Sequence, residues 1–193
     1  MKVLVAGAGI GGLALAQGLT RAGVDVEVVE RDHDVSESRG YKLHLGPPAV
    51  AALRQLLTPT GVERLLGSAI ATSGFTLVVR DHRARRLFLA REKQDALSLD
   101  VDRSTLRALL SRDLDGAVHW GTTAVSYSSS SSGVRLRLRG GGSTQGDVLV
   151  IADGASSRLA HQLAGAPTST PTGLLGIAGR AAWRDVPPLP APC

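Results

Sequence analysis

The sequence is poor in cysteine and in aromatic residues, and each shortage argues against a class of protein. Its single cysteine, Cys193, stands at the last position of 193, so no disulfide pair is available and a reducing cytoplasm is the expected compartment. Aromatic residues make up 3% of the chain, which leaves little on which nucleic-acid bases could stack. The core must therefore be built mainly from Ala, Val, Leu and Ile.

Three further patterns are missing. No segment approaches the roughly 18 uninterrupted apolar residues of a membrane-spanning helix, and glycines break the apolar stretch after Lys2, so we expect neither a membrane association nor a secretory signal. The five histidines lack metal-ligand spacing, so no metal site is expected. The net charge is +5, but the basic residues have no interleaved aromatics, which argues against a nucleic-acid partner.

The first thirty residues carry the strongest pattern. An apolar run over 3–6 predicts a buried strand, and a glycine-rich segment over 7–12 follows it. A helical pattern then ends at Gly23, and a second apolar strand over 24–29 leads to Glu30. This order of strand, glycine loop, helix, strand and acid predicts the βαβ unit that binds dinucleotides.

Each part of this unit has a physical purpose. Gly7 permits the tight turn out of the strand, and Gly9 lacks the Cβ that would keep a pyrophosphate away from the backbone. Gly12 lets the helix pack against the sheet, while the first amides of that helix attract phosphate. The Glu30 carboxylate can accept hydrogen bonds from ribose hydroxyls. The unit alone does not decide between FAD and NAD.

The remaining chain predicts further helices and strands. Asp153 and Gly154 follow the last buried strand, at the strand end where α/β folds bind their ligands. We expect a helical segment with an entry loop over 41–67, a hairpin over 74–91, a helix over 102–114, a short strand over 118–120, paired strands over 122–127 and 134–139 joined by a serine-rich mobile turn over 128–132, a strand over 148–152 and one more over 173–183.

Three segments together resemble the N-terminal half of the FAD-dependent monooxygenases related to para-hydroxybenzoate hydroxylase and the tetracycline-degrading monooxygenases. The first runs from the glycine loop 7–12 to Glu30-Arg31-Asp32. The second is Val-Asp-Arg-Ser-Thr-Leu-Arg over 101–107, and the third is the Asp-Gly motif within 146–158. One departure is Ile151, where the family often has glycine. Another is length, because the family's chains are about twice as long and carry a second Gly-Asp motif.

The resemblance implies FAD as the cofactor and assigns a role to particular residues. Arg31 would lie beside the adenine end, and Arg103 would reach the phosphates or the ribityl chain. Asp153 and Gly154 would lie near the cofactor and the approach of the pyridine nucleotide. No catalytic side chain is expected, because in that family the flavin carries the reaction. The implied cofactor contacts are Gly7, Gly9, Ile10, Gly11, Gly12, Glu30, Arg31, Arg103, Asp153 and Gly154.

The resemblance also implies the fold and its division into domains. We expect an α/β fold: a Rossmann-like FAD-binding domain with a parallel sheet and a β-meander crossover, plus a partial substrate-domain sheet. The FAD-binding domain would span 1–165, with 69–100 contributing to the substrate-domain sheet. Residues 166–193 would hold the truncated start of the substrate domain and a proline-rich tail.

Three functions are consistent with these observations. The first is a truncated NAD(P)H-dependent flavoprotein monooxygenase that hydroxylates an aromatic small molecule. The second is a catalytically incompetent half-enzyme that binds FAD, or a subunit that needs a partner; self-association or a partner chain supplying the missing half would then be expected. The third is an NAD(P)-dependent Rossmann dehydrogenase, against which Arg103 and the second Asp-Gly strand argue.

Overall fold

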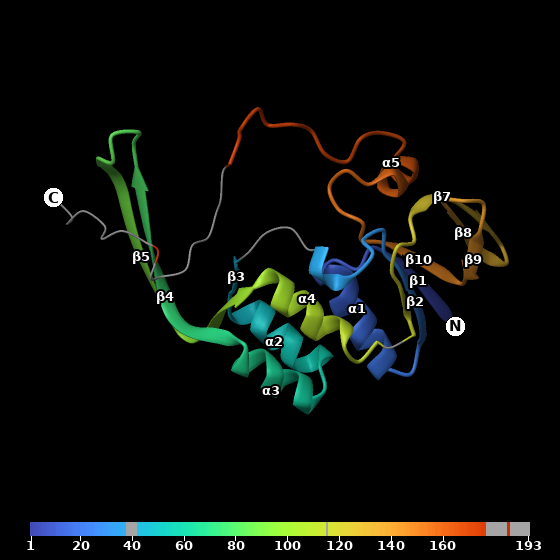
Figure 1. The fold of residues 1–193 in the computed structure, drawn as a ribbon, viewed down its shortest axis with the longest axis horizontal. Helices are drawn as coiled ribbons and strands as arrows, with labels where there is room; N and C mark the ends of the chain where they lie inside the picture. Colours follow the sequence, from blue (N-terminus) through green and yellow to red (C-terminus); the bar gives the residue numbers. More distant parts are fainter. Residues whose placement is uncertain (38–41, 115, 177–184, 186–193) are drawn as a thin grey trace.

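The central layer of the molecule is a parallel sheet with strand order β10–β1–β2–β6 (Figure 1). The computed structural model describes residues 1–37, 42–114, 116–176 and 185. β1 pairs with β2 on one side and with β10 on the other, so the carboxyl ends of all three strands meet at one edge. The strands are β1 Lys2–Ala6, β2 Asp25–Val29, β6 Val118–His119 and β10 Val148–Ile151.

Alternate residues of β1 are buried on opposite faces of this sheet. Val3 and Val5 belong to the larger apolar core, on the helical side, whereas Leu4 and Ala6 belong to a smaller core on the other side. None of the four is more than 4% exposed. A strand buried on both faces needs a continuous apolar run, which explains why the sequence between Lys2 and Gly7 contains no polar residue.

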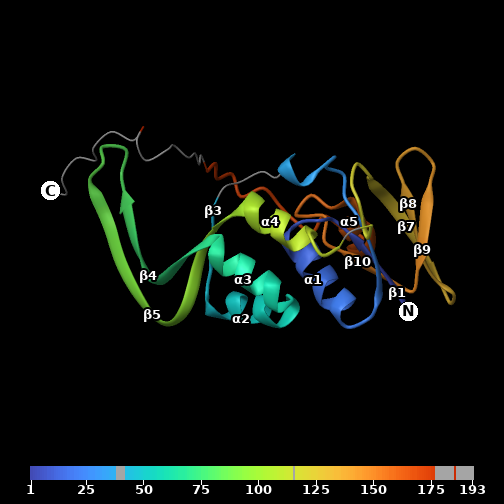
Figure 2. The same cartoon turned by 60° about the horizontal axis from the view of Figure 1, so that its bottom comes forward.

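Helices α1 to α4 contribute apolar side chains to the larger core, and they group together in Figures 1 and 2. Proline starts both α2 and α3, where its missing N–H costs no hydrogen bond. The hydroxyl of Thr58 caps α3 by accepting from the Gly61 amide at 3.1 Å. The four helices are α1 Ile10–Arg21, α2 Pro47–Leu56, α3 Pro59–Gly67 and α4 Arg103–Ser111.

The other face of the parallel sheet packs against an antiparallel meander and helix α5. Val134 and Leu136 of the meander and Leu159 of α5 are buried with Leu4 of the sheet. The meander connects β6 to β10, which is the crossover that the resemblance implied. Its strands are β7 Ala124–Ser130, β8 Gly133–Leu138 and β9 Ser143–Gly146, and α5 is Arg158–Ala164.

A second antiparallel sheet, with order β3–β5–β4, begins in the core and extends beyond it (Figures 1 and 2). Leu99 and Val101 anchor its base in the larger core. Beyond an irregularity between Thr72 and Gly74, β4 and β5 continue as a two-stranded hairpin that leaves the body of the protein. The strands are β3 Lys42–Leu45, β4 Ala69–Arg80 and β5 Arg86–Asp102, and a 3-10 turn, η1, covers Val35–Glu37.

The α/β fold class is confirmed, but several local predictions were wrong. Residues 42–45 form a strand where an entry loop was expected, and the long helix breaks before Pro59, which disfavours helical backbone in the residue preceding it. The serines at 128–130 extend β7 rather than forming a mobile turn. Both β9 and α5 were missed.

The C-terminal predictions are tested less fully. The strand expected over 173–183 lies mostly outside the described residues, and 173–176 are not a strand. The proline-rich tail also lies largely outside them, and the domain boundaries 1–165 and 166–193 stay a prediction. Within the described part of the chain, no helix has the length and apolar character needed to cross a membrane.

A polar cluster joins β1, β2 and β9 on the face of the parallel sheet that the meander covers. Lys2 Nζ lies 2.6 Å from Glu27 Oε2, and Thr144 Oγ1 donates to the same oxygen at 2.8 Å. Burial alone raises the pKa of Glu27, but hydrogen bonds from Lys2 and Thr144 outweigh it and hold that pKa below the ordinary value of 4.5. A carboxyl group of this kind stabilises the fold only while it is ionised.

Replacing Glu27 with glutamine is therefore expected to lower the free energy of unfolding at pH 7 by about 1 kcal/mol. The contribution is present above the unfolded-state pKa near 4.5 and is lost as the pH falls through the lower folded-state value. Urea unfolding of both proteins at a series of pH values measures this difference. A gap between wild type and variant that stays constant down to the most acidic condition would contradict the assignment.

Candidate functional site

The glycine loop after β1 has a conformation and a packing that require glycine at two positions. Gly7 has φ +107°, and a Cβ there would lie 2.5 Å from the Ala152 carbonyl oxygen. The Gly7 amide donates to the Val29 carbonyl at 2.8 Å, which fixes the turn against β2. A Cβ on Gly12 would lie 2.0 Å from the Gly7 carbonyl oxygen. Both glycines therefore hold the loop, helix α1 and the sheet close together.

The amino end of α1 is open. Gly9 is the N-cap residue, and no side chain of a described residue caps this end of the helix. A Cβ built on Gly9 or on Gly11 meets no atom within 4 Å, so the backbone faces free space at both positions. Unsatisfied amides and the positive end of the helix dipole then point into space that a phosphate can enter. This geometry fits the expected phosphate cradle, and phosphate binding here stays a prediction.

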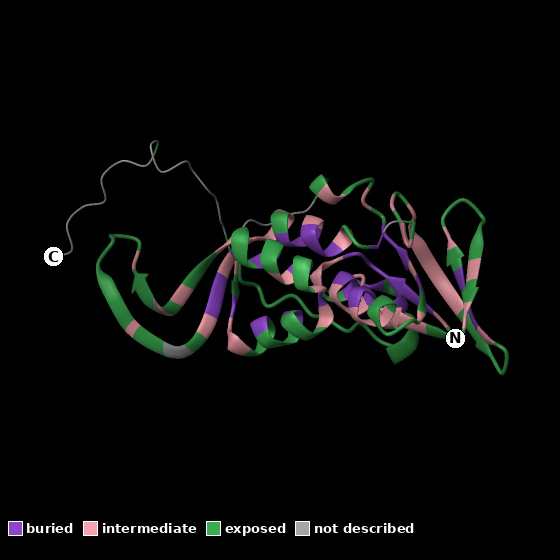
Figure 3. Ribbon diagram, turned by 90° about the horizontal axis from the view of Figure 1, so that it is seen from below, coloured by how far each residue is buried: buried purple, intermediate pink, exposed green. Residues whose placement is uncertain are grey.

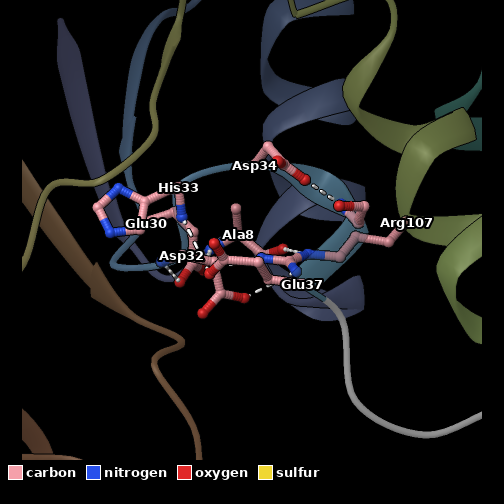
Figure 4. Close-up of polar contacts among 8 residues, drawn as sticks. Ala8, Glu30, Asp32, His33, Asp34, Glu37 and Arg107 are labelled. Atoms are coloured by element: carbon pink, nitrogen blue, oxygen red, sulfur yellow. Dashed lines mark hydrogen bonds and ion pairs between the residues drawn. The ribbon is translucent and has the colours of Figure 1, made fainter.

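Glu30 turns toward this loop, as Figure 4 shows. Its Oε2 accepts a hydrogen bond from the Ala8 amide at 2.6 Å, and its Oε1 accepts from the Asp32 amide at 3.0 Å. The residue is only 7% exposed. A carboxylate has about four acceptor positions, so ribose hydroxyls can still bind beside these two amides. Glu30 therefore clamps the loop and keeps capacity for a ligand.

Arg107 of α4 completes this cluster, and the sequence analysis missed it. Its Nε donates to the Ala8 carbonyl at 2.8 Å, and its Nη1 donates to Asp32 Oδ2 at 2.8 Å. Its Nη2 lies 3.4 Å from Glu30 Oε2. The guanidinium carbon also lies 5.1 Å from the centroid of the Trp120 ring, within range of a cation–π interaction. The residue is only 4% exposed.

Asp153 lies at the same edge of the sheet, after β10. The Cβ position of Gly7 is 2.8 Å from the Asp153 Cα, so the Asp-Gly motif and the glycine loop are direct neighbours. Asp153 Oδ1 is buried and has no hydrogen-bond partner among the described residues. A buried acceptor without a partner is rare in folded proteins and indicates a ligand or a solvent molecule. The neighbouring Gly154, with φ +95°, is exposed.

The structure brings most of the predicted residues together. The loop 7–12, Glu30 and the Asp-Gly motif converge at one sheet edge. Arg31 is exposed, and Arg103 is half-buried at the first position of α4, one helical turn before Arg107. The roles proposed for these two arginines, and the individual cofactor contacts, stay predictions.

These features fit the ADP half of a dinucleotide. The open helix terminus suits the pyrophosphate, Glu30 suits the ribose, and the partnerless Asp153 oxygen suits a hydroxyl or N–H of the ligand. No group of three potential metal ligands occurs among the residues that the structure describes. The fold and the site together define a dinucleotide-binding α/β protein.

The chain belongs to the FAD-binding domain family, whose model matches residues 1–187. This match decides between the two cofactors that the βαβ unit left open, in favour of FAD. The resemblance to FAD-dependent monooxygenases is likewise confirmed by the relatives of the chain.

Two curated relatives illustrate the likeness. The chain is 31% identical over 166 residues to a dual O-methyltransferase/FAD-dependent monooxygenase of Cercospora beticola, covering 80% of this chain and 19% of the relative. It is 31% identical over 185 residues to the chloroplastic zeaxanthin epoxidase of Oryza sativa subsp. japonica, covering 88% of this chain and 27% of the relative. It therefore spans about a fifth to a quarter of the length of these relatives.

A solved structure shares the fold. The match to a protein of Photorhabdus luminescens, assigned as an FAD-containing monooxygenase, has a TM-score of 0.73 and 28% sequence identity. It covers 86% of this chain and 42% of the other. The parallel sheet, the meander and the antiparallel strands therefore form an arrangement that also occurs in a larger protein.

Proposed function

We propose that this chain binds FAD and forms the cofactor-binding part of an NAD(P)H-dependent monooxygenase that hydroxylates an aromatic small molecule. The observation that carries the proposal is the convergence of the open α1 terminus, Glu30 and the partnerless Asp153 oxygen at one sheet edge. Family membership and the monooxygenases among the relatives support the reaction class.

The chain's own residues bind and orient the cofactor. The first amides of α1 bind the pyrophosphate, and the missing side chain of Gly9 lets it approach. Glu30 accepts from the adenosine ribose, and Asp153 accepts a hydrogen bond from the cofactor beside Gly7. Bound FAD supplies electron transfer from a reduced pyridine nucleotide and the activation of oxygen. We assign no catalytic residue to this chain.

The reaction is tested with the FAD-loaded protein under air. We expect NADH or NADPH oxidation that an aromatic substrate accelerates, with a product that has gained one oxygen atom by mass spectrometry. The substrate panel includes phenols and, as a comparison, unsaturated non-aromatic compounds, because one relative is an epoxidase. Acceleration only by the non-aromatic compounds would contradict the aromatic assignment. Tighter binding of NAD(P) than of FAD would instead support a dehydrogenase.

A second candidate is an FAD-binding part without turnover that needs further polypeptide, and the β4–β5 hairpin favours it. In the hairpin register Val78 is opposite Leu89 on one face, and Val79 is opposite Phe88 on the other face. All four residues are exposed, Phe88 by 53%. Most of the distal part of the hairpin carries the colour for exposed residues in Figure 3. Continuous apolar runs are typical of strands that are covered on both faces. Bound flavin without NAD(P)H oxidation would select this candidate.

We propose that polypeptide completing the substrate-domain sheet covers this hairpin in the working enzyme. β3 pairs only with the base of β5, at residues 99–102, so the described part of the sheet leaves the distal hairpin edges open. Open edges with apolar faces promote association. Without a cover, the purified chain is therefore expected to self-associate as its concentration rises.

The self-association is measured by sedimentation velocity over a concentration series. Replacing Val79 and Phe88 together with threonine should shift the protein toward monomer, because both lie on one apolar face. The control is Arg91→Thr, which changes an exposed polar residue of the same hairpin. A wild-type chain that stays monomeric at every concentration would contradict the need for a cover.

A further inference from the structure

Arg107 is the most deeply buried cation of the site, and it lies between two carboxylates and the loop that would bind a phosphate. The carboxylates of Glu30 and Asp32 both lie within 3.4 Å of its guanidinium. Ala8, whose carbonyl accepts from Arg107 Nε, is part of the same loop that has to receive a negatively charged pyrophosphate. Two anionic side chains therefore border an anion site.

Without Arg107 the site would repel its ligand. Two carboxylates beside the loop would present two negative charges to the pyrophosphate, whereas Arg107 cancels one of them. The Arg107 side chain is only 5% exposed, and that of Glu30 only 9%, so water screens these charges weakly. The ring of Trp120 at 5.1 Å stabilises the cation from another side.

Arg107 also fixes geometry. Its guanidinium contacts Ala8 of the glycine loop, Glu30 after β2 and Asp32. A planar fork with five donors can satisfy these acceptors together, which a single ammonium group does less well. The loop and the acid are thus held in their binding arrangement before any ligand arrives.

We propose that Arg107 is a positioning residue that neutralises the Glu30–Asp32 pair and pre-organises the loop for the FAD pyrophosphate. The inference rests on the proposed binding of FAD. A role in charge balance can be distinguished from a purely structural role. If the charge balance matters, removing one of the two carboxylates should restore part of the FAD affinity that is lost with the arginine. A structural role through packing alone predicts no such compensation.

The test compares FAD dissociation constants, measured by flavin fluorescence, for four proteins: wild type, Arg107→Met, Asp32→Asn and the double variant. We expect Arg107→Met to weaken FAD binding by about a hundredfold and the double variant to recover about tenfold of this loss. Asp32→Asn alone should tighten FAD binding, because it removes a negative charge beside the pyrophosphate while Arg107 stays in place. The matched control is Arg112→Met, which removes the same charge from an exposed position after the same helix.

The outcomes separate this inference from the proposed function. A wild-type chain that binds no FAD overturns both. Wild-type binding with equal constants for Arg107→Met and Arg112→Met overturns the inference alone, and so does a double variant that recovers nothing. If Arg107→Met fails to fold, Arg107→Lys tests the charge role instead, because lysine keeps the positive charge. We expect its FAD binding to lie within about tenfold of wild type, and complete loss would contradict the charge role.

Discussion

Replacing Gly9 with alanine is expected to weaken FAD binding by about a hundredfold without destabilising the chain. The Cβ of an alanine at this position meets no protein atom within 4 Å, and the backbone φ of −71° suits any residue. Only a ligand that approaches the backbone closely would meet the new methyl group. The free energy of unfolding without ligand should therefore change by no more than about 0.5 kcal/mol.

The measurement pairs an FAD titration with urea unfolding of the ligand-free protein. Gly67→Ala is the control, because a Cβ there also meets nothing within 4 Å but lies at the far end of α3. Its FAD affinity should match that of wild type. Unchanged affinity of Gly9→Ala would show that the pyrophosphate does not approach this part of the loop.

The second large effect is expected at Gly12, and it needs no ligand. A Cβ there would lie 2.0 Å from the Gly7 carbonyl oxygen, a backbone atom that is fixed by the turn between β1 and α1. The clash can be removed only if α1 moves away from the sheet. Gly12→Ala should therefore lower the free energy of unfolding by about 3 kcal/mol. Loss of FAD binding would follow from the displaced helix.

The neighbouring glycine provides the comparison for this prediction. A Cβ on Gly11 meets nothing within 4 Å, and alanine favours helix formation, so Gly11→Ala should keep or slightly raise the stability of the ligand-free chain. Urea unfolding of both variants measures the contrast. If Gly12→Ala unfolds at the same urea concentration as Gly11→Ala, the close contact between α1 and the loop does not hold.

The βαβ unit could be predicted because its determinants are local. Strand, glycine loop, helix and acid all lie within the first thirty residues, and the structure places Glu30 against the loop as the pattern predicts. Asp153 also lies beside the glycine loop. It was expected at the carboxyl edge of the parallel sheet because it follows a buried apolar strand. Parallel pairing of β10 with β1 then brings it beside Gly7.

The role of Arg107 could not be predicted in the same way, because its partners lie far away in the sequence. Its hydrogen bonds join it to residues 99 and 75 positions earlier. One signal was available: on a helical projection Arg107 falls on the apolar face, near Leu110 and Leu114. A cation on the buried face of an amphipathic helix needs a partner, and this would have pointed to acids elsewhere.

The long strand β5 and the strand β9 were missed for a different reason. Residues 91–95 are all charged or polar, so the sequence alone does not predict that β5 continues through them. Pairing with β4 extends to Lys93 and resumes at Ser98, on the other side of the irregularity in the register. Likewise β9 has the sequence Ser-Thr-Gln-Gly, and its extended conformation follows from its pairing with β8. Tertiary pairing outweighs local preference in both strands.

The most direct test of the account is the absorption spectrum of the purified chain after incubation with FAD and gel filtration. We expect flavin absorbance to elute with the protein and to persist on a second passage. Adding a large excess of NAD should not displace it. Flavin that elutes entirely in the small-molecule fraction, or that NAD displaces from the protein, would contradict the assignment of this site to FAD.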